Sequence, residues 1–201
     1  MINIIDYGSG NVGSVFNMLK KIGVESKVIS KPSLLKSSEK LILPGVGAFD
    51  DGMTRLESFG WIDFLDHNVI KNKIPILGIC LGMQLMTKSS EEGDKPGLSW
   101  VEADVKKFSF NNNLKVPHMG WNNINPLKNN ELFYELNNQS RFYHVHSYYV
   151  SLNDSSIEIA STNYGINFTS SFQKDNIFGV QFHPEKSHKY GMQLLSNFSK
   201  I

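Results

Sequence analysis

The sequence predicts a doubly wound, mostly parallel α/β sheet with helices on both faces and a strand-rich second half. Short apolar runs alternate with helically spaced segments four times before residue 88. Strands that alternate with helices pair in parallel, because each helix carries the chain back to the starting edge of the sheet. No composition break marks a linker, so we expect residues 1–201 to form a single domain.

The first half supplies the alternation. Apolar runs that predict strands occupy residues 2–7, 25–30, 40–43 and 75–79. Apolar spacing that predicts helices covers residues 12–22, 50–58, 61–71 and 81–88. Gly23 is placed to end the first of these helices. We expect the crossovers between the parallel strands to be right-handed.

The second half is rich in strands. Runs that predict strands cover residues 101–110, 121–124, 142–150, 157–161, 166–173 and 177–182, with a turn at 111–113 and a short helix at 131–136. Residues 117–122 read as an exposed loop that holds Trp121.

Composition excludes several classes of function. Hydrophobic residues make up 40% of the 201 residues, so a disordered chain is not expected, and a formal net charge of +1 gives no electrostatic case for nucleic acid. Cys80 is the single cysteine, which rules out an internal disulfide and fits a reducing cytoplasm. No apolar run reaches membrane-spanning length, so we expect no membrane association.

One stretch points to nucleophilic chemistry. Cys80 directly follows the predicted strand 75–79 and stands between Gly78 and Gly82, with a predicted helix behind it. Gly-x-nucleophile-x-Gly between strand and helix is the nucleophile-elbow arrangement, in which small neighbours permit a strained turn. A helix N-terminus also favours a thiolate over a thiol. The alternative interpretation is a small buried core cysteine.

A second motif provides a base for that nucleophile. His183 ends the predicted strand 177–182, and Pro184 stiffens its link to Glu185. An imidazole held by a carboxylate can take the thiol proton and later protonate a leaving amine. Alone, the motif would read as a surface turn. Together with Cys80 at another strand end, it favours a Cys-His-Glu triad.

Three weaker patterns leave alternatives open. Gly8, Gly10 and Gly13 have the spacing of a dinucleotide-binding loop but lack the acidic residue that should follow, so a tight turn is the other interpretation. The segment 44–49 is a glycine-containing turn whose amides can face a ligand, or an ordinary turn. His144 and His146 share one strand face, but without a completing ligand motif we expect no metal.

Taken together, these residues resemble a class I (triad) glutamine amidotransferase. The match is carried by the segments 78–84 and 183–185, which are two separated motifs in the expected order. Within that class, the segments 44–49, 117–122 and 183–187 are similar to the HisH family, the glutaminase subunits of imidazole glycerol phosphate synthase. The resemblance covers essentially the whole chain. His144 departs from it, since an apolar or aromatic residue is usual there.

The resemblance implies a role for each matching position. The triad would be Cys80, His183 and Glu185. An oxyanion hole would come from the backbone of Val46, Gly47 and Leu81. Contacts to glutamine would come from Gly47, Gln84, Ser147 and Tyr148, the last two through their backbone. A partner interface would include Asn11, Trp121, Tyr143 and Lys186.

The implied reaction is hydrolysis of glutamine to glutamate and ammonia, without a cofactor or metal. The ammonia would pass to a HisF-like (β/α)₈-barrel cyclase subunit in a heterodimer, which converts PRFAR to imidazole glycerol phosphate and AICAR in histidine biosynthesis. Three alternatives remain open. One is a HisH-like paralogue that supplies a sugar amidotransferase of surface-glycan biosynthesis. The others are a stand-alone cysteine hydrolase and a non-catalytic homologue, against which the intact triad argues.

Overall fold

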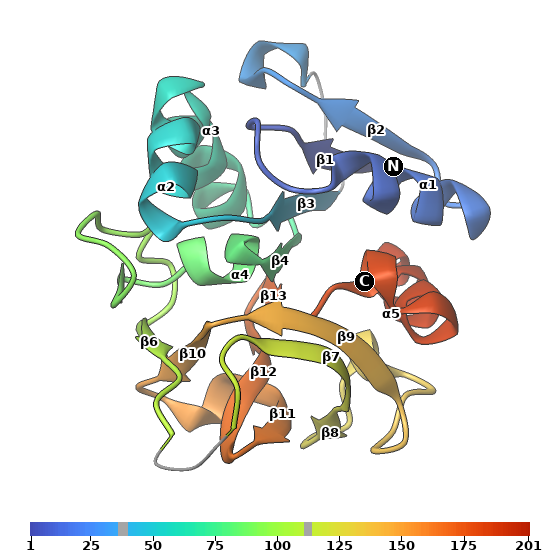
Figure 1. Ribbon diagram of the computed structural model, residues 1–201. Helices are drawn as coiled ribbons and strands as arrows, with labels where there is room; N and C mark the ends of the chain where they lie inside the picture. The colour runs from blue at the N-terminus through green and yellow to red at the C-terminus, as the bar shows by residue number, and fades with distance from the viewer. Residues whose placement is uncertain (36–39, 111–113) are drawn as a thin grey trace.

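One large twisted sheet runs through the molecule in the computed structural model, which describes residues 1–35, 40–110 and 114–201 (Figure 1). Its main path has the strand order β2-β1-β3-β4-β13-β12-β10-β6-β5, and β11 and β8 extend it beside β12. The strands of the first half are β1 (Ile2–Ile5), β2 (Ser26–Ile29), β3 (Lys40–Gly45) and β4 (Ile76–Cys80). All of these pair in parallel, as does β4 with β13 (Ile177–Val180), which confirms the predicted parallel sheet.

Helices cover both faces of this parallel part (Figure 1). On one face lie α1 (Val12–Lys21) and α5 (His188–Lys200). On the other lie α2 (Phe49–Ser58), α3 (Trp61–Leu65), the π-helical turn η2 (Asp66–Lys71) and α4 (Leu81–Leu85). Successive side chains of β3 pack into two different hydrophobic cores, one on each face of the sheet, because side chains alternate between the faces of a strand. Ile42 packs in the core with Leu19 and Leu194, whereas Leu43 packs in the core with Leu56 and Leu65.

The second half is antiparallel where its strands pair with one another, apart from β5 with β6. Its strands in the main sheet are β5 (Ser89–Ser90), β6 (Ala103–Lys107), β8 (Asn125–Pro126), β10 (Tyr148–Leu152), β11 (Glu158–Tyr164) and β12 (Ile166–Lys174). Short 3₁₀ turns connect elements at η1 (Pro32–Leu34), η3 (Glu131–Phe133), η4 (Ser155–Ile157) and η5 (Pro184–Lys186). The short helix expected at 131–136 is therefore a single 3₁₀ turn, and the helix expected at 81–88 ends at Leu85. The turn expected at 111–113 lies outside the described residues.

Two expectations about the second half are wrong. The strand expected at 142–150 breaks at Ser147 into β9 (Arg141–His146) and β10, which lie in different sheets. The loop expected at 117–122 is instead part of a strand, β7 (His118–Asn123), which begins before the strand expected at 121–124 and pairs antiparallel with β9 in a separate ribbon (Figure 1). Apolar runs show neither where a strand changes sheets nor whether a polar segment finds a pairing partner.

None of the helices within the described part of the chain is long and apolar enough to cross a membrane.

Candidate active site

Cys80 lies at the sharp turn between β4 and α4, in a backbone conformation that non-glycine residues rarely adopt. Its φ is 53° and its ψ is −110°. The glycines around it allow the turn because neighbouring backbone comes very close. A Cβ at Gly82 would lie 1.8 Å from the carbonyl oxygen of Leu43, and one at Gly78 would lie 2.7 Å from the carbonyl oxygen of Gly82. The elbow geometry predicted from Gly-x-Cys-x-Gly is therefore present, with the strain that such turns store at functional sites.

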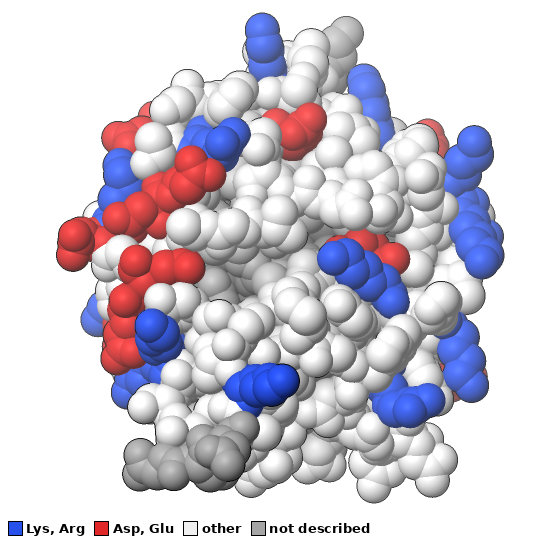
Figure 2. Space-filling view, viewed as in Figure 1, with Lys and Arg blue, Asp and Glu red and all other residues white. Residues whose placement is uncertain are grey.

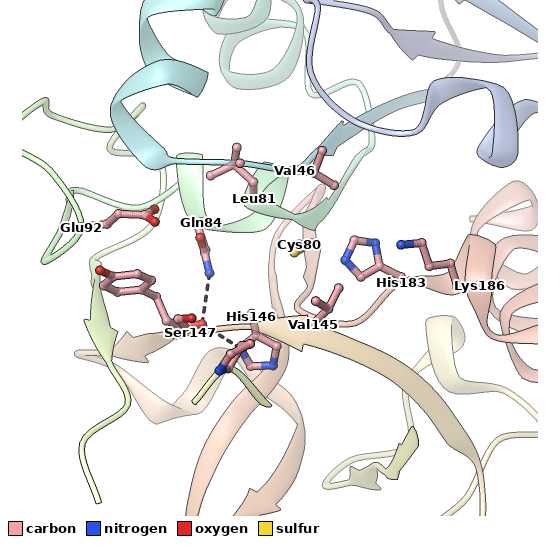
Figure 3. Close-up of a pocket in the computed structure, with 13 residues that line it drawn as sticks. Val46, Cys80, Leu81, Gln84, Glu92, Val145, His146, Ser147, His183 and Lys186 are labelled. Carbon is pink, nitrogen blue, oxygen red and sulfur yellow. Dashed lines mark hydrogen bonds between the residues drawn. The ribbon is translucent and has the colours of Figure 1, made fainter. Parts of the chain in front are cut away.

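His183 and Glu185 form a buried pair next to this elbow. His183 Nδ1 lies 2.8 Å from Glu185 Oε1, and their side chains are 1% and 3% exposed. The backbone of His183 is held by its N–H, which donates to Tyr143 O at 2.9 Å, and Pro184 begins the turn η5. Among the described residues His183 Nε2 has no hydrogen-bond partner, and in Figure 3 the imidazole lies beside the Cys80 sulfur.

The charges around His183 favour the protonated imidazole. Burial alone would lower the pKa of His183, but the Cys80 thiolate and the Glu185 carboxylate raise it to about 10. The imidazole is therefore suited to hold a proton taken from the thiol. Glu185 fixes Nδ1 as the protonated nitrogen of the neutral ring, which leaves Nε2 as the base.

The elbow and the base meet at a pocket of about 560 Å³, visible as the hollow near the centre of the face in Figure 2. Cys80 and His183 both contribute to its wall (Figure 3). The residues expected to bind glutamine or its oxyanion also line it, namely Val46, Gly47, Leu81, Gln84, Ser147 and Tyr148. Three segments with sequence motifs thus converge after the parallel strands β3, β4 and β13, as expected. The segment 147–148 joins them from the break between β9 and β10.

The Val46–Gly47 turn is held by a residue that the sequence did not indicate. Ser9 Oγ accepts from the Val46 N–H at 3.2 Å and donates to the Val46 carbonyl oxygen at 2.6 Å. In this conformation the Val46 N–H is engaged by Ser9. Gly47 follows with φ of 105°, a value that favours glycine. The glycine loop around Ser9 therefore supports this turn, and Gly10 is needed because a Cβ there would lie 3.0 Å from the backbone of Pro44.

Glu92 is a further pocket residue that sequence reasoning missed. Its carboxylate lies at the pocket wall and accepts the Phe49 N–H at 2.9 Å, at the start of α2 (Figure 3). No sequence motif indicated Glu92, because it lies in the polar loop between β5 and β6. The side chain of Gln84 is held by the main chain of β10, since its Nε2 donates to Tyr148 O at 3.2 Å.

Three histidines converge at one side of the pocket, and His146 lines its wall. The sequence singled out His144 and His146, and the β7–β9 pairing places His118 opposite His146. All three are buried, and one ring nitrogen from each lies within 4.8 Å of those from the others, a spacing that could hold a metal ion. His118 is the third partner that the sequence did not provide, because the segment 117–122 was interpreted as an exposed loop.

The hydrogen bonds around His118 indicate which nitrogen of its neutral ring carries the proton. Asn122 Nδ2 donates to Asn163 O at 2.9 Å, and Asn122 Oδ1 accepts the Asn123 N–H, so the amide group facing His118 Nε2 at 3.2 Å is a donor. His118 therefore carries its proton on Nδ1, which lies 3.2 Å from His146 Nε2. A metal ion bound by Nδ1 of His118 would have to displace that proton. Burial lowers the pKa of His118 to about 4 and of His146 to about 3, in keeping with neutral rings.

His144 should make the protein sensitive to acid. Burial, followed by its histidine neighbours, lowers the pKa of His144 well below 6.5, and its Nε2 has no hydrogen-bond partner in the described structure. The unfolded chain takes up this proton below pH 6.5 and the folded protein does not, so stability falls as the pH falls. We expect His144→Phe to reduce the loss of unfolding free energy between pH 7 and pH 5 by about 2 kcal/mol.

Urea unfolding of both proteins at the two pH values checks this expectation. His67→Phe is the matched control, because it makes the same substitution at an exposed position and keeps His144 in place. Equal losses in the wild type and His144→Phe would contradict a neutral, buried His144.

The four residues expected at a partner interface are all exposed or half-buried. Asn11 caps α1, where its Oδ1 accepts the Ser14 N–H at 3.2 Å, and it is exposed. Trp121 is 45% exposed and stacks on His188 at 5.4 Å between ring centroids. Tyr143 packs edge-on against Trp121, and the ammonium of Lys186 lies 5.7 Å from the Tyr143 ring centroid. Trp121, Tyr143 and Lys186 therefore form one continuous surface, which we call the Trp121 face.

Comparison with known proteins agrees with this site. Residues 3–201 match the family model described as glutamine amidotransferase class-I. The solved structure of a putative GMP synthase protein from Thermoplasma acidophilum superposes with a TM-score of 0.73 at 25% identity, covering 99% of this chain and 92% of that one. The chain belongs to the class I glutamine amidotransferases.

Relatives that match this chain over its full length show which family within the class it belongs to. Subunit HisH 2 of imidazole glycerol phosphate synthase from Methanococcus maripaludis is 54% identical, over 100% of this chain and 99% of that protein. The protein of the same name from Pseudomonas aeruginosa is 48% identical over 100% of both chains. Within the class, the chain belongs to the HisH family.

Proposed function

We propose that this chain hydrolyses glutamine at Cys80 and delivers the ammonia to a HisF-like (β/α)₈-barrel cyclase, for synthesis of imidazole glycerol phosphate and AICAR from PRFAR. The observation that carries the proposal is the pocket in which the strained Cys80 meets the buried His183–Glu185 pair. A thiol, an imidazole and a carboxylate in this order perform acyl transfer.

In the proposed reaction, His183 Nε2 takes the Cys80 proton, and the thiolate attacks the side-chain amide carbon of glutamine. The resulting oxyanion accepts hydrogen bonds from the backbone N–H groups of Leu81 and Gly47. One such donor typically stabilises the transition state by about 3–4 kcal/mol. His183 then gives its proton to the departing nitrogen as the carbon–nitrogen bond breaks and ammonia leaves. Water, activated by the same imidazole, hydrolyses the thioester to glutamate and regenerates the thiol.

The pocket has complementary groups for the other end of glutamine. Glu92 offers a carboxylate to the α-ammonium group. The carbonyl oxygen of Ser147 already accepts a hydrogen bond from the Phe108 N–H at 3.0 Å. The carbonyl oxygen of Tyr148 accepts one from Gln84 Nε2. What these two residues present to a substrate is therefore their N–H groups, which suit the α-carboxylate. The break between β9 and β10 is what brings both residues to the pocket.

The Trp121 face is where we place the barrel. Large aromatic anchors and cations beside a site mouth are typical of interface centres, and Lys186 belongs both to this face and to the pocket wall. A partner seated there would cover the pocket and receive ammonia without release into water.

The Ser9 contact supports control of hydrolysis by that partner. Ser9 holds both the N–H and the C=O of Val46, so the Val46–Gly47 peptide cannot turn freely in this conformation. A partner loaded with its nucleotide would select the peptide orientation that completes the oxyanion hole.

We expect the isolated chain to release glutamate at least roughly 100-fold more slowly than the complex with the cyclase and its nucleotide ligand, since a missing oxyanion donor costs about that much. A coupled glutamate assay with and without the partner measures this.

Trp121→Ala should weaken complex formation in calorimetric titration, whereas Tyr134→Ala, which removes an exposed aromatic ring elsewhere, should not. Full activity of the chain alone would refute partner control, and unchanged affinity of Trp121→Ala would refute docking on this face.

A further inference from the structure

The Cys80 sulfur has a second buried neighbour, to which the sequence motifs assign no role. Gln181 precedes His183 by two residues and is fully buried. Its Nε2 lies 3.7 Å from Cys80 Sγ, within the range of a hydrogen bond to sulfur. Its Oε1 lies 3.0 Å from Gln84 Nε2. The thiol is therefore contacted by an amide group as well as faced by the imidazole of the triad.

The direction of these hydrogen bonds follows from a backbone carbonyl. Tyr148 O can only accept, so the Gln84 group 3.2 Å from it must be the NH₂ (Figure 3). That NH₂ also faces Gln181, so the Gln181 atom it meets must be the carbonyl oxygen. The remaining NH₂ of Gln181 then points at Cys80 Sγ. The amide orientation is set by a chain of three groups that begins at the fixed main chain of β10.

We propose that Gln181 is a catalytic residue, whose Nε2–H donates to the Cys80 thiolate while His183 holds the proton. The proposal rests on the glutaminase function proposed above. A neutral donor stabilises the anionic sulfur more than the uncharged thiol, because hydrogen bonds to charged groups are about twice as strong. The effect is enlarged by burial, since water does not compete for Gln181.

The arrangement also explains why the Gln84 side chain is engaged inward. Both hydrogens of its NH₂ are used, one on Tyr148 O and one on Gln181 Oε1. Gln84 thereby connects the backbone expected to bind the glutamine carboxylate with the donor that faces the nucleophile. In this scheme Gln84 is the positioning residue, acting on sulfur through Gln181.

The test is Gln181→Met, which keeps the length of the side chain and adds no charge but removes the donor to sulfur. We expect the rate of Cys80 alkylation by iodoacetamide at pH 7 to fall at least roughly tenfold, the loss expected for one hydrogen bond to a charged group. The pH midpoint of the alkylation rate should rise by about one unit or more. In the partner-bound protein, kcat for glutamine hydrolysis should fall while KM changes little. A merely structural role for Gln181 would not move the alkylation midpoint.

Gln193→Met on α5 is the matched control, since it makes the same substitution outside the pocket and should leave both profiles unchanged. Superimposable alkylation profiles for folded Gln181→Met and the wild type would overturn the proposal. Alkylation needs no glutamine turnover, so it decides the role of Gln181 even if the chain proves not to be a glutaminase.

Thermal unfolding of Gln181→Met shows whether the variant folds. If it does not, the wild type provides the second measurement. The side-chain amide signals of Gln181 in nitrogen–proton NMR spectra should shift with the same pH midpoint as Cys80 alkylation, and this shift should be absent in Cys80→Ala. Gln181 signals that do not respond to pH in the wild type would equally overturn the proposal.

Discussion

Cys80→Ser is expected to lower glutamine hydrolysis by the partner-bound protein at least roughly 10⁴-fold, because removing a nucleophile leaves only binding and the oxyanion hole. A serine hydroxyl keeps the size and the backbone of the elbow, but it is a far weaker nucleophile than a thiolate beside an imidazolium. The measurement is glutamate release at saturating glutamine.

The matched control is the reaction of the partner with added ammonium salt. This reaction bypasses Cys80 and should be unchanged in the Cys80→Ser complex if the two chains still assemble. A glutamine-like electrophile such as 6-diazo-5-oxonorleucine should modify Cys80 in the wild type. Substantial turnover by Cys80→Ser, or complete inactivation with Cys80 unmodified, would show that the nucleophile is elsewhere.

His183→Ala should lower kcat by roughly 10³-fold or more, and Glu185→Ala by less, since an orienting carboxylate performs only part of the task of the base. The two residues are joined by the 2.8 Å contact between Nδ1 and Oε1, so the double variant should lose much less than the product of the single losses. Steady-state rates of the three variants decide this. Strictly multiplicative losses would mean that the pair does not act in one step.

An NMR titration of His183 provides an independent readout of the same unit. The pKa of His183 is about 10 because the Cys80 thiolate and the Glu185 carboxylate outweigh burial, which alone would lower it. Removing either negative partner removes part of the effect that opposes the lowering of the His183 pKa by burial. The pKa of His183 should therefore be lower in Cys80→Ser and in Glu185→Gln than in the wild type. An unchanged titration in Cys80→Ser would show that the sulfur is not charged beside His183.

Local motifs of the sequence were sufficient to predict the parallel half and the placement of Cys80 beside the His183–Glu185 pair. The alternation of strands and helices predicts a parallel sheet because chain direction is a local property. Gly78, Cys80 and Gly82 predict a strained elbow because their spacing has a steric cause. His183, Pro184 and Glu185 are neighbours in sequence, so their geometry follows from a single turn. The meeting of elbow and base was predicted because parallel strands end at one edge.

Only the tertiary structure decided the features that depend on pairing between distant segments. Ser147 reaches the pocket because one apolar run changes sheets there, and His118 is buried because a polar segment pairs with β9. Glu92 and Ser9 meet the site from loops that carry no motif. The orientation of Gln181 toward Cys80 requires Tyr148, Gln84 and Gln181 in contact, three residues far apart along the chain. Periodicity records which face of an element is apolar, whereas hydrogen-bond direction and strand exchange are set by partners that only folding brings together.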